Sequence, residues 1–555
     1  MVRSPHPHAE IRSIDVSPAL SVDGVLAALT IDDWLADGLN PIPHSPIPSG
    51  GDGLGMSMEQ WKEVFIGRQY PMARDRVRYV GEVVAIVVAE SEAAARLGAE
   101  AVAVDYAPLP AVALTDLASV EGSARVWDET ENVCLDTAFG NKEATDASFE
   151  AAAHIVKHKF RIARVTGVPM EPRAAIAEYD QGRDHYALIA GGGGAVRFKK
   201  ELIAIFDAPE SNIRVITPDV GGNFGTRNRL YPVFPLVMWV ARKIGKKVRW
   251  LSERSENFLS DFQGRDLLSS LELALDEDGK FLALRVDNIS NIGAFSSSFT
   301  PLSKGAEISV GPYLFGSARV RARGVFSHSS PTNPYRSAGR PEVIYALERL
   351  VDMAAEEIGM ERVELRRRNL IPDEAFPYDN KLEMLYDSGE MLACLDKALS
   401  LGDWDGFEAR QKVSEARGLL RGRGISCYVE SSSGAPLERS EITINPDTET
   451  VEVIIGTQDS GQGHETSFCQ VAAEYLSVPF GQVQLRQGDT DFVSVGGGSH
   501  SGRSMRMAGT VIVMASEKLI EKGRKLAALV LEAAVEDIVF QDGSFAIEGT
   551  DRAIG

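Results

Sequence analysis

Asp219-Val-Gly-Gly-Asn-Phe-Gly225 is the stretch around which this chain is organised. It follows an apolar, β-rich run, Ile213-Arg-Val-Ile-Thr-Pro218, and this order predicts a buried strand that ends in a glycine-rich loop. Gly221, Gly222 and Gly225 lack a Cβ, so the backbone can turn tightly and its N–H groups can approach a ligand closely. A glycine-rich turn after a strand is only a turn in most proteins, so this loop becomes a candidate site through the motifs that accompany it.

The composition of the chain is that of a large folded protein with an acidic surface. Its 555 residues exceed what one hydrophobic core organises, so several domains are expected. The net charge of −21 argues against nucleic acid or an anionic membrane surface as the main partner. We find no signal peptide and no apolar run of about 18 residues, so the sequence predicts no membrane span and a cytoplasmic location.

The four cysteines, Cys134, Cys394, Cys427 and Cys469, lie far apart in the sequence. Because no C-x-x-C pair is present, the sequence predicts neither a zinc ribbon nor an iron–sulfur cluster in this chain. So few cysteines in a long chain favour a reducing compartment over a disulfide scaffold.

The spacing of apolar residues predicts an α+β chain in several parts. Residues 1–112 predict a small α+β unit, and residues 113–150, which show no strong period, predict a connector. A first α/β region is expected over 151–375 and a second over 390–555.

Both regions contain helix and hairpin signals. In the first, the pattern predicts a helix near 196–206 and a hairpin across Glu277-Asp-Gly279. In the second, it predicts a hairpin over Pro446-Asp447, a helix after Gly463 and a strand at 483–485.

Glycine-rich loops occur at 191–194, 221–225, 461–463 and 496–498. Three of them lie between a strand and a helix, where free N–H groups and the helix dipole favour an anion. Neither a P-loop nor a complete G-x-G-x-x-G fingerprint is present, so the pattern predicts a phosphate-bearing ligand held in another way. The alternative for each loop is an ordinary turn.

Several motifs follow one another in a recognisable order. Arg78-Tyr-Val-Gly-Glu-Val-Val-Ala85 and Val104-Asp-Tyr-Ala-Pro-Leu-Pro110 come first. The later motifs are Met170-Glu-Pro-Arg-Ala174, Asp219 to Gly225, Tyr335-Arg-Ser-Ala-Gly-Arg-Pro-Glu342, Gly461-Gln-Gly-His-Glu-Thr466 and Gly498 to Ser504. In this order the chain resembles, over essentially its whole length, the molybdopterin-binding large subunit of the xanthine oxidase/dehydrogenase, aldehyde oxidase and carbon monoxide dehydrogenase family. The resemblance implies an N-terminal a/b hammerhead domain followed by two mixed α/β molybdopterin-binding domains, the second incomplete.

The resemblance also implies roles for particular residues. Arg336 and Phe224 would be catalytic, with Arg336 stabilising negative charge as the substrate carbon is attacked; a structural salt bridge is the alternative for this arginine. The residues expected to bind the cofactor are Gly221, Gly222, Asn223, Phe224, Gly225, Gln462, Gly463, His464, Thr466, Ser499, Ser501, Arg503 and Ser504. The molybdenum would be held by the dithiolene sulfurs of the pterin rather than by protein side chains.

The chemistry implied is oxidative hydroxylation of a small molecule, with water as the oxygen source. The cofactor would be molybdenum-molybdopterin in its cytosine dinucleotide form. Because this chain has no iron–sulfur ligands and no flavin fingerprint, its electrons would pass to an iron–sulfur small subunit and an FAD-binding medium subunit. The assembly expected from the resemblance is a dimer of heterotrimers.

The sequence departs from the family pattern at several positions. Gly193 stands where the family usually has a glutamine near an oxo ligand. Ser337 stands where carbon monoxide dehydrogenases have a copper-binding cysteine, and serine is a poor ligand for copper(I). Asn228 stands where purine oxidisers carry a glutamate. The expected substrate is therefore an aldehyde or an N-heteroaromatic rather than carbon monoxide or xanthine.

The family's general base is a glutamate in a far C-terminal segment that nothing here matches, and both ends of the chain are expected to be clipped. Two alternatives follow. One is a non-catalytic homologue or fragment that binds partner subunits without turnover. The other is a generic anion-binding α/β protein without molybdenum.

Overall fold

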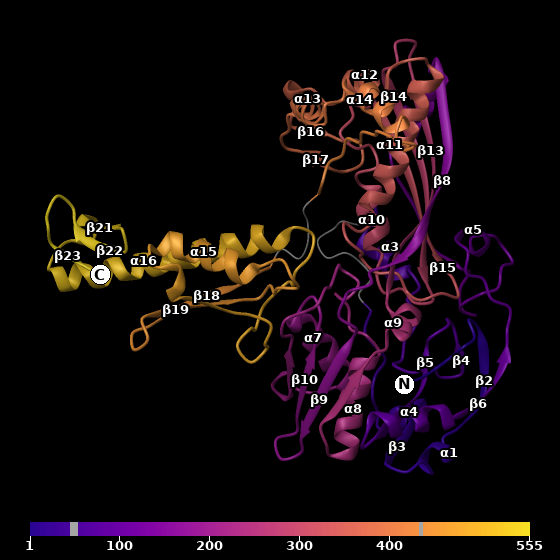
Figure 1. Cartoon of the computed structure of the whole chain (residues 1–555), viewed down its shortest axis with the longest axis vertical. Coiled ribbons are helices and arrows are strands. Elements are labelled where there is room, and N and C mark those ends of the chain that lie inside the picture. Colours follow the sequence, from indigo (N-terminus) through magenta and orange to yellow (C-terminus); the bar gives the residue numbers. More distant parts are fainter. Residues whose placement is uncertain (45–53, 432–436) are drawn as a thin grey trace.

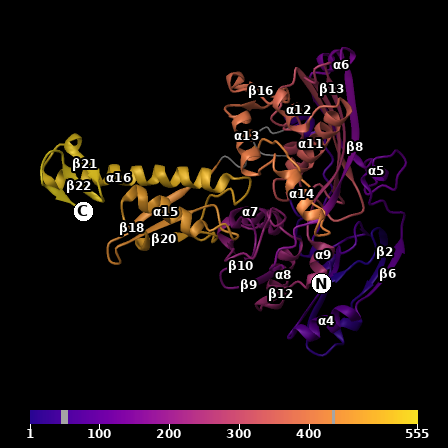
Figure 2. The same ribbon diagram turned by 45° about the horizontal axis from the view of Figure 1, so that its top comes forward.

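The computed structural model describes residues 1–44, 54–431 and 437–555. Figure 1 shows an elongated body formed by the chain up to residue 431 and an arm formed by the residues from 437 on. The C-terminus lies at the tip of the arm, far from the N-terminus in the body, and Figure 2 shows the same separation from another side. The fold is α+β throughout.

The N-terminal unit contains two small sheets, with strand orders β1-β5-β3 and β4-β2-β6. Its central strand, β5, is buried from Val83 to Val87, as its β-branched sequence predicts. Ser91 caps the next helix by accepting a hydrogen bond from the Ala94 N–H at 3.2 Å. The elements of this unit are β1 (Val2–Arg3), β2 (Ala9–Asp15), α1 (Ser17–Leu20), β3 (Val25–Thr30), α2 (Ile31–Ala36), α3 (Met58–Glu63), β4 (Arg76–Val77), β5 (Val83–Ala89), α4 (Glu92–Ala101) and β6 (Ala103–Pro108).

A four-stranded sheet, of order β11-β10-β9-β12, packs against helices α7 and α8. Helix α8 is apolar on almost every side and is buried from Val233 to Ala241. The hydrophobic core between this sheet and its helices also contains side chains of α2 and β5. The N-terminal unit and this sheet therefore share one hydrophobic cluster. The elements here are β9 (Ala174–Asp180), β10 (His185–Ala190), α7 (Ala195–Phe206), β11 (Ile213–Ile216), α8 (Val233–Ile244), β12 (Val248–Leu251) and α9 (Arg254–Ser260).

A longer sheet, of order β7-β15-β14-β13-β8, forms the upper part of the body in Figure 1. The hairpin expected across Glu277-Asp-Gly279 is confirmed, because β13 and β14 pair antiparallel with Leu271 opposite Val286. Helix α11 packs on this sheet through Leu347, Leu350 and Val351. The elements are β8 (His154–Thr166), β13 (Gln263–Leu275), β14 (Phe281–Gly293), α10 (Thr300–Ala306), β15 (Ser317–Phe326), α11 (Arg340–Glu357) and α12 (Arg362–Asn369).

Residues 113–150 differ from the connector that the sequence predicts. They contain α5 (Thr115–Ala118), β7 (Val133–Gly140) and α6 (Lys142–Glu150), and β7 is an edge strand of the longer sheet, antiparallel to β15. Leu135 and Phe139 of β7 are buried in the core of that sheet. Polar residues separate these few apolar side chains. The run of alternating apolar and polar residues is therefore short, and its strand signal is weak.

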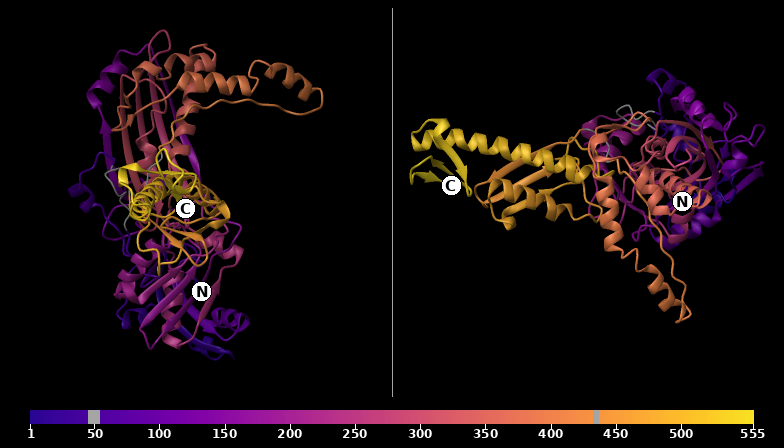
Figure 3. Two further views of the ribbon diagram at one scale, coloured as in Figure 1. Left: turned by 90° about the vertical axis from the view of Figure 1, so that its left-hand side faces the viewer. Right: turned by 90° about the horizontal axis from the view of Figure 1, so that it is seen from above.

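The chain then forms a projection before it enters the arm. Helices α13 (Met391–Leu401) and α14 (Phe407–Glu415) extend away from the body in both views of Figure 3. They follow a short hairpin of β16 (Tyr378–Asp379) and β17 (Leu385–Tyr386).

The arm has its own sheet, of order β18-β19-β20, covered by α15 and by the long helix α16. The predicted hairpin over Pro446-Asp447 and the predicted strand at 483–485 are confirmed. The elements are β18 (Ser440–Asn445), β19 (Thr450–Ile455), α15 (His464–Leu476), β20 (Val483–Arg486), a π-helical turn (Ser504–Ala508), α16 (Gly509–Leu531), β21 (Ile538–Gln541), β22 (Ser544–Ile547) and β23 (Ala553–Ile554).

Candidate functional site

The loop 219–225 leaves the end of β11, as predicted, and Glu171 holds its base. The Gly221 N–H donates to Glu171 Oε2 at 2.6 Å, and the Glu171 N–H donates to the Gly221 carbonyl at 3.2 Å. A Cβ on Gly221 would overlap the Glu171 side chain, so only glycine allows this approach. The Met170-Glu-Pro-Arg-Ala174 motif therefore stabilises the loop through hydrogen bonds between Glu171 and Gly221.

Asn223 organises the rest of the loop from within. Its Oδ1 accepts hydrogen bonds from the N–H groups of Gly225 at 3.3 Å and Arg227 at 3.2 Å. Among the described residues, no acceptor is found for the backbone N–H groups of Gly222, Asn223 and Phe224. The Phe224 side chain is 44% exposed on a left-handed backbone, φ 51°. The tip of the loop thus offers a row of free donors and an aromatic ring.

The structure brings Phe224 and Arg336 together. The Arg336 N–H donates to the Phe224 carbonyl at 2.9 Å. A Cβ on Gly225 would overlap the Pro334 carbonyl, and a Cβ on Gly264 would overlap the Tyr335 side chain. The segment before Arg336 therefore packs against the backbone at positions 225 and 264, and both positions must be glycine to allow this approach.

The Arg336 side chain is exposed and makes no ion pair or hydrogen bond within residues 1–44, 54–431 and 437–555. The salt bridge considered as its alternative role has no partner in this part of the chain. The Arg336 side chain is therefore exposed on a backbone segment that is hydrogen-bonded to Phe224.

Arg265 holds the Arg336 segment in place, and no local motif predicts this. Its guanidinium donates to the carbonyls of Tyr335 at 3.0 Å and Arg336 at 2.8 Å. It also pairs with the buried carboxylate of Glu342, in the first turn of α11, at 3.0 Å. Burial raises the pKa of Glu342, while the charge of Arg265 opposes that rise. Arg265 comes from β13, far from Arg336 in sequence.

The glycine loops of the body and the arm meet. The Ser499 N–H donates to the Gly193 carbonyl at 2.9 Å, and a Cβ on Gly498 would overlap the same carbonyl. Gln458 adds two bonds across the same junction, since its amide accepts from the Ala195 N–H at 3.0 Å and donates to the Gly192 carbonyl at 2.8 Å.

A chain of polar side chains lies behind this junction. Gln462 donates to Ser499 Oγ at 2.7 Å, Ser499 and Ser504 share a hydrogen bond of 2.9 Å, and Ser504 reaches Thr457 at 2.9 Å. Ser499, Ser504 and Thr457 are buried, whereas Gln462 is exposed. The structure therefore places Gln462, Ser499 and Ser504 together, as predicted, and adds Thr457.

The anion site expected at the start of α15 already contains a carboxylate. Asp459 accepts hydrogen bonds from four successive N–H groups, at 2.6 to 3.0 Å, namely those of Gly461, Gln462, Gly463 and His464. Burial acts to raise the pKa of Asp459, but these donors outweigh it and hold the pKa below its usual range. The expectation that these N–H groups are free for a phosphate is wrong, because the chain's own carboxylate satisfies them.

The remaining predicted residues divide into exposed and buried groups. Thr466 is exposed on the first turn of α15, and Ser501 lies beside His500 at 3.2 Å. His464 is buried, stacks on Phe468 and leaves its Nδ1 without a partner among the described residues.

Arg503 has no exposed surface. It pairs with Glu438 at 2.7 Å and donates to the Gly498 carbonyl at 2.7 Å. These contacts favour a role in supporting the glycine loop over direct contact with a ligand.

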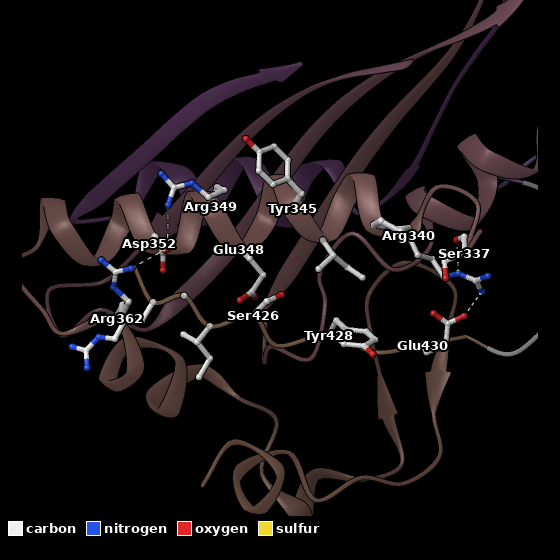
Figure 4. Close-up of a pocket in the computed structure, with 15 residues that line it drawn as sticks. Ser337, Arg340, Tyr345, Glu348, Arg349, Asp352, Arg362, Ser426, Tyr428 and Glu430 are labelled. Atoms are coloured by element: carbon white, nitrogen blue, oxygen red, sulfur yellow. Dashed lines mark hydrogen bonds and ion pairs between the residues drawn. The ribbon is translucent and has the colours of Figure 1, made fainter. Parts of the chain in front are cut away.

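A cavity of about 620 Å³ lies along α11 next to the Arg336 segment. Figure 4 shows Ser337 and Arg340 at one end, Glu348 near the middle and Asp352 at the other end. Neither Arg336 nor Phe224 lines it, so the candidate site is defined by the meeting loops rather than by this cavity. Within the described residues there is no cluster of three or more His, Cys, Asp or Glu side chains that could hold a metal ion. In the same residues no helix is long and apolar enough to cross a membrane.

Comparison with known proteins identifies domains over most of the chain. Residues 126–370 and 397–554 each match the molybdopterin cofactor-binding domain, and residues 1–110 match the a/b hammerhead domain of aldehyde oxidase and xanthine dehydrogenase.

Individual relatives extend this match. The chain is 31% identical to the 6-hydroxypseudooxynicotine dehydrogenase complex subunit gamma of Paenarthrobacter nicotinovorans, covering 100% of this chain and 69% of the relative. It is 30% identical to the carbon monoxide dehydrogenase large chain of Hydrogenophaga pseudoflava, covering 99% and 70%. The crystal structure of quinoline 2-oxidoreductase from Pseudomonas putida 86 superposes with a TM-score of 0.88 at 30% identity, covering 99% of this chain and 70% of that one.

Proposed function

The chain belongs to the family of molybdopterin-binding large subunits that includes xanthine dehydrogenase, aldehyde oxidase and carbon monoxide dehydrogenase, and on this premise we propose that it hydroxylates an N-heteroaromatic compound. It is a subunit of a molybdenum-dependent oxidoreductase that works with partner subunits. Two relatives are named for pyridine- or quinoline-type compounds, which favours this substrate class over an aldehyde. Ser337 in place of a copper-binding cysteine disfavours carbon monoxide.

One observation supports the catalytic assignment. The backbone that carries Arg336, whose side chain has no partner among the described residues, is hydrogen-bonded to Phe224 in the loop whose tip bears the unbonded N–H groups. Fixed donors and a positive charge at one point stabilise negative charge that develops during a reaction. They cost no reorganisation at the moment of reaction, because Asn223 and Arg265 already hold the backbones that carry them.

The residues present fit a molybdopterin cofactor. A Cβ added to Gly461 or Gly463 would have no neighbour within 4 Å, so a flat ligand can lie against these bare backbones. Gln462, Ser499 and Thr466 would hold the pterin and its phosphate tail through side chains, because Asp459 already accepts the N–H groups of residues 461–464. When bound, the molybdenum cofactor supplies the two-electron oxidation and the activation of water.

The residues of this chain would orient the reaction. Phe224 would form the floor beside the reacting centre, and Arg336 would stabilise the charge on the substrate as its carbon is attacked. We propose that the electrons pass to an iron–sulfur small subunit and then to an FAD-binding medium subunit. The assembly that we propose is a dimer of heterotrimers. The cytosine dinucleotide is the form of the pterin that we propose.

Substitution of Arg336 tests the proposal. In the assembled complex, from a host that makes the cofactor, Arg336→Ala should lower kcat/KM for a quinoline- or pyridine-type substrate by about 10²–10³-fold while molybdenum content stays unchanged. Molybdenum is measured by inductively coupled plasma mass spectrometry. The control is Arg349→Ala, a surface position on α11 whose side chain is 52% exposed.

Three outcomes would contradict the assignment. Equal loss of metal and turnover would make Arg336 structural. Less than about a tenth of an equivalent of molybdenum in the wild-type complex would remove the basis for molybdenum chemistry. Turnover of aldehydes with none of N-heteroaromatics would overturn the substrate class.

A further inference from the structure

The backbone of Gly193 is fixed from both sides of the site. Its N–H donates to the Arg227 carbonyl at 3.1 Å, and its carbonyl accepts from the Ser499 N–H of the arm at 2.9 Å. The preceding carbonyl, that of Gly192, accepts from Gln458 at 2.8 Å. Because these bonds join the body to the arm, position 193 cannot move without loosening that junction.

There is no room for a side chain at position 193. A Cβ built on Gly193 would lie closer than 3.0 Å to Asn228 Oδ1, and at 2.5 Å from Asn223 Nδ2. Real Cβ atoms essentially never show such distances. The backbone of Gly193 is not left-handed, so the glycine is required by the neighbouring amides and not by its own conformation.

The two asparagine side chains form a fixed pair in that space. Asn223 Nδ2 donates to Asn228 Oδ1 at 2.7 Å, while Asn223 Oδ1 holds the N–H groups of Gly225 and Arg227. Asn223 cannot turn away without releasing the loop. The NH2 group of Asn228, by contrast, has no acceptor within the part of the chain that the structure describes, and Asn228 is partly exposed.

We propose that the Asn228 amide has taken the place of a side chain at position 193, so that its NH2 group is the hydrogen-bond donor which this wall of the site offers to a ligand oxygen. The inference rests on the proposed function. The oxygen would belong either to the bound cofactor or to the substrate, because both kinds of ligand carry oxygen acceptors. Gly193 and Asn228 are then coupled positions, because the Asn228 amide fills the space that a side chain at position 193 would need.

The coupling is tested first, by thermal unfolding of the assembled complex. Gly193→Ala should lower the Tm by about 2–3 °C, whereas the control Gly191→Ala, whose new Cβ would meet nothing closer than 3.6 Å, should stay within about 0.5 °C of wild type. Adding Asn228→Ala removes the overlap with the Asn228 amide but not that with Asn223 Nδ2, so Gly193→Ala should lower the Tm clearly less in the Asn228→Ala background than in wild type. Additive losses, or a Gly193→Ala variant as stable as Gly191→Ala, would overturn the proposal.

The donor role is tested with Asn228→Asp, which keeps an oxygen for Asn223 and removes the NH2 group. We expect this variant to keep its Tm within about 2 °C of wild type and to keep its molybdenum content. It should lose the hydrogen bond that the Asn228 NH2 group donates to the ligand oxygen. If the cofactor supplies the oxygen, the absorption spectrum of the resting complex changes without substrate. If the substrate supplies it, the spectrum is unchanged and KM rises about tenfold with little change in kcat. A variant with wild-type spectrum and KM would refute the donor role.

Failure of this inference is distinguishable from failure of the proposed function. The proposed function fails if the wild-type complex contains no molybdenum or does not hydroxylate. The inference fails if the wild-type complex is loaded and active but Gly193 and Asn228 behave as independent positions.

Discussion

Arg265 has an unusual backbone for a residue inside a strand. Its φ is 64° and that of Asp266 is 66°, so two consecutive residues of β13 are left-handed. Such conformations cost about 1 kcal/mol or more each and persist only where the surroundings hold them. Here the distortion points the guanidinium at the carbonyls of Tyr335 and Arg336 and at Glu342. We infer that Arg265 is a positioning residue for Arg336.

Removing this positioning residue should act through Arg336. Arg265→Ala leaves two carbonyls and the buried Glu342 carboxylate without their donor, so the Arg336 segment should become mobile. We expect kcat to fall about 10- to 100-fold in the loaded complex with molybdenum retained. Arg265→Lys should recover little, because one ammonium cannot hold both carbonyls in a fixed fork.

A double-mutant cycle separates positioning from general destabilisation. In an Arg336→Ala background, Arg265→Ala should cost no further activity, because its effect passes through the absent side chain. If the two losses multiply, Arg265 supports the fold and not the position of Arg336.

At the scale of elements, the loop before helix α15 shows that a correctly predicted turn can have its N–H groups satisfied within the chain. The glycine loop and the helix start lie where they are predicted, but Asp459 accepts the N–H groups of residues 461–464. A signal for this is present in the sequence, because an aspartate side chain commonly accepts N–H groups of the turn that follows it. The glycine pattern alone does not account for that carboxylate.

Local periodicity was sufficient for the strands and helices that surround the site. It predicted β11, α7, the β13–β14 hairpin and the hairpin of the arm. The ordered motifs were sufficient to bring Phe224 near Arg336. What local pattern could not supply were contacts between distant segments, such as Arg265 with Arg336 or Asn228 with Gly193, because these depend on how sheets and loops pack in three dimensions.

Two histidines join the N-terminal unit to the longer sheet. His8, before β2, and His328, after β15, lie with ring centroids 4.1 Å apart, and His328 Nδ1 accepts from the Val112 N–H at 3.1 Å. Burial lowers the pKa of both, and burial together with the proximity of His8 brings the pKa of His328 to about 3. At neutral pH both rings are therefore uncharged in the folded protein.

This pair should make stability fall on acidification. Below about pH 6.5 the unfolded chain takes up protons that the folded state refuses, so stability present above that pH is lost as the pH falls towards 3. His328→Asn keeps an acceptor for the Val112 N–H and does not titrate. We expect its Tm to fall less than that of wild type between pH 7 and pH 5, measured by differential scanning calorimetry.

The control is His158→Asn, at an exposed position of β8, which should follow the wild-type curve. Parallel curves for wild type and His328→Asn would show that His328 does not contribute to the acid sensitivity of the fold.

At the scale of the whole molecule, polar contacts hold the arm against the edge of β11. Arg214 forms a bidentate pair with Asp489, at 3.0 and 2.6 Å. The Thr217 N–H donates to the Gly488 carbonyl at 2.7 Å, and the Val215 N–H donates to Thr490 Oγ1 at 2.9 Å. These contacts position the arm so that its glycine loops reach Gly193. The geometry of the candidate site therefore depends on a junction that lies beside it.

Asp489→Ala should loosen this junction without unfolding the body. The pair is partly exposed, with Asp489 13% and Arg214 35% exposed, so its loss should cost about 0.7–1.4 kcal/mol. Amide hydrogen exchange should then become about 3- to 10-fold faster at Val215 and Thr217, whose N–H groups face residues 488–490. Exchange at Leu188, inside the β9–β10 ladder, should not change, and that amide is the internal control. Equal acceleration at Leu188 would mean that the whole body is destabilised, and unchanged exchange at Val215 and Thr217 would mean that the pair does not hold the arm.

If the junction between the arm and β11 sets the geometry of the site, Asp489→Ala should also lose molybdenum faster than wild type during dialysis. The reason is that the loops that would enclose the cofactor then separate more often.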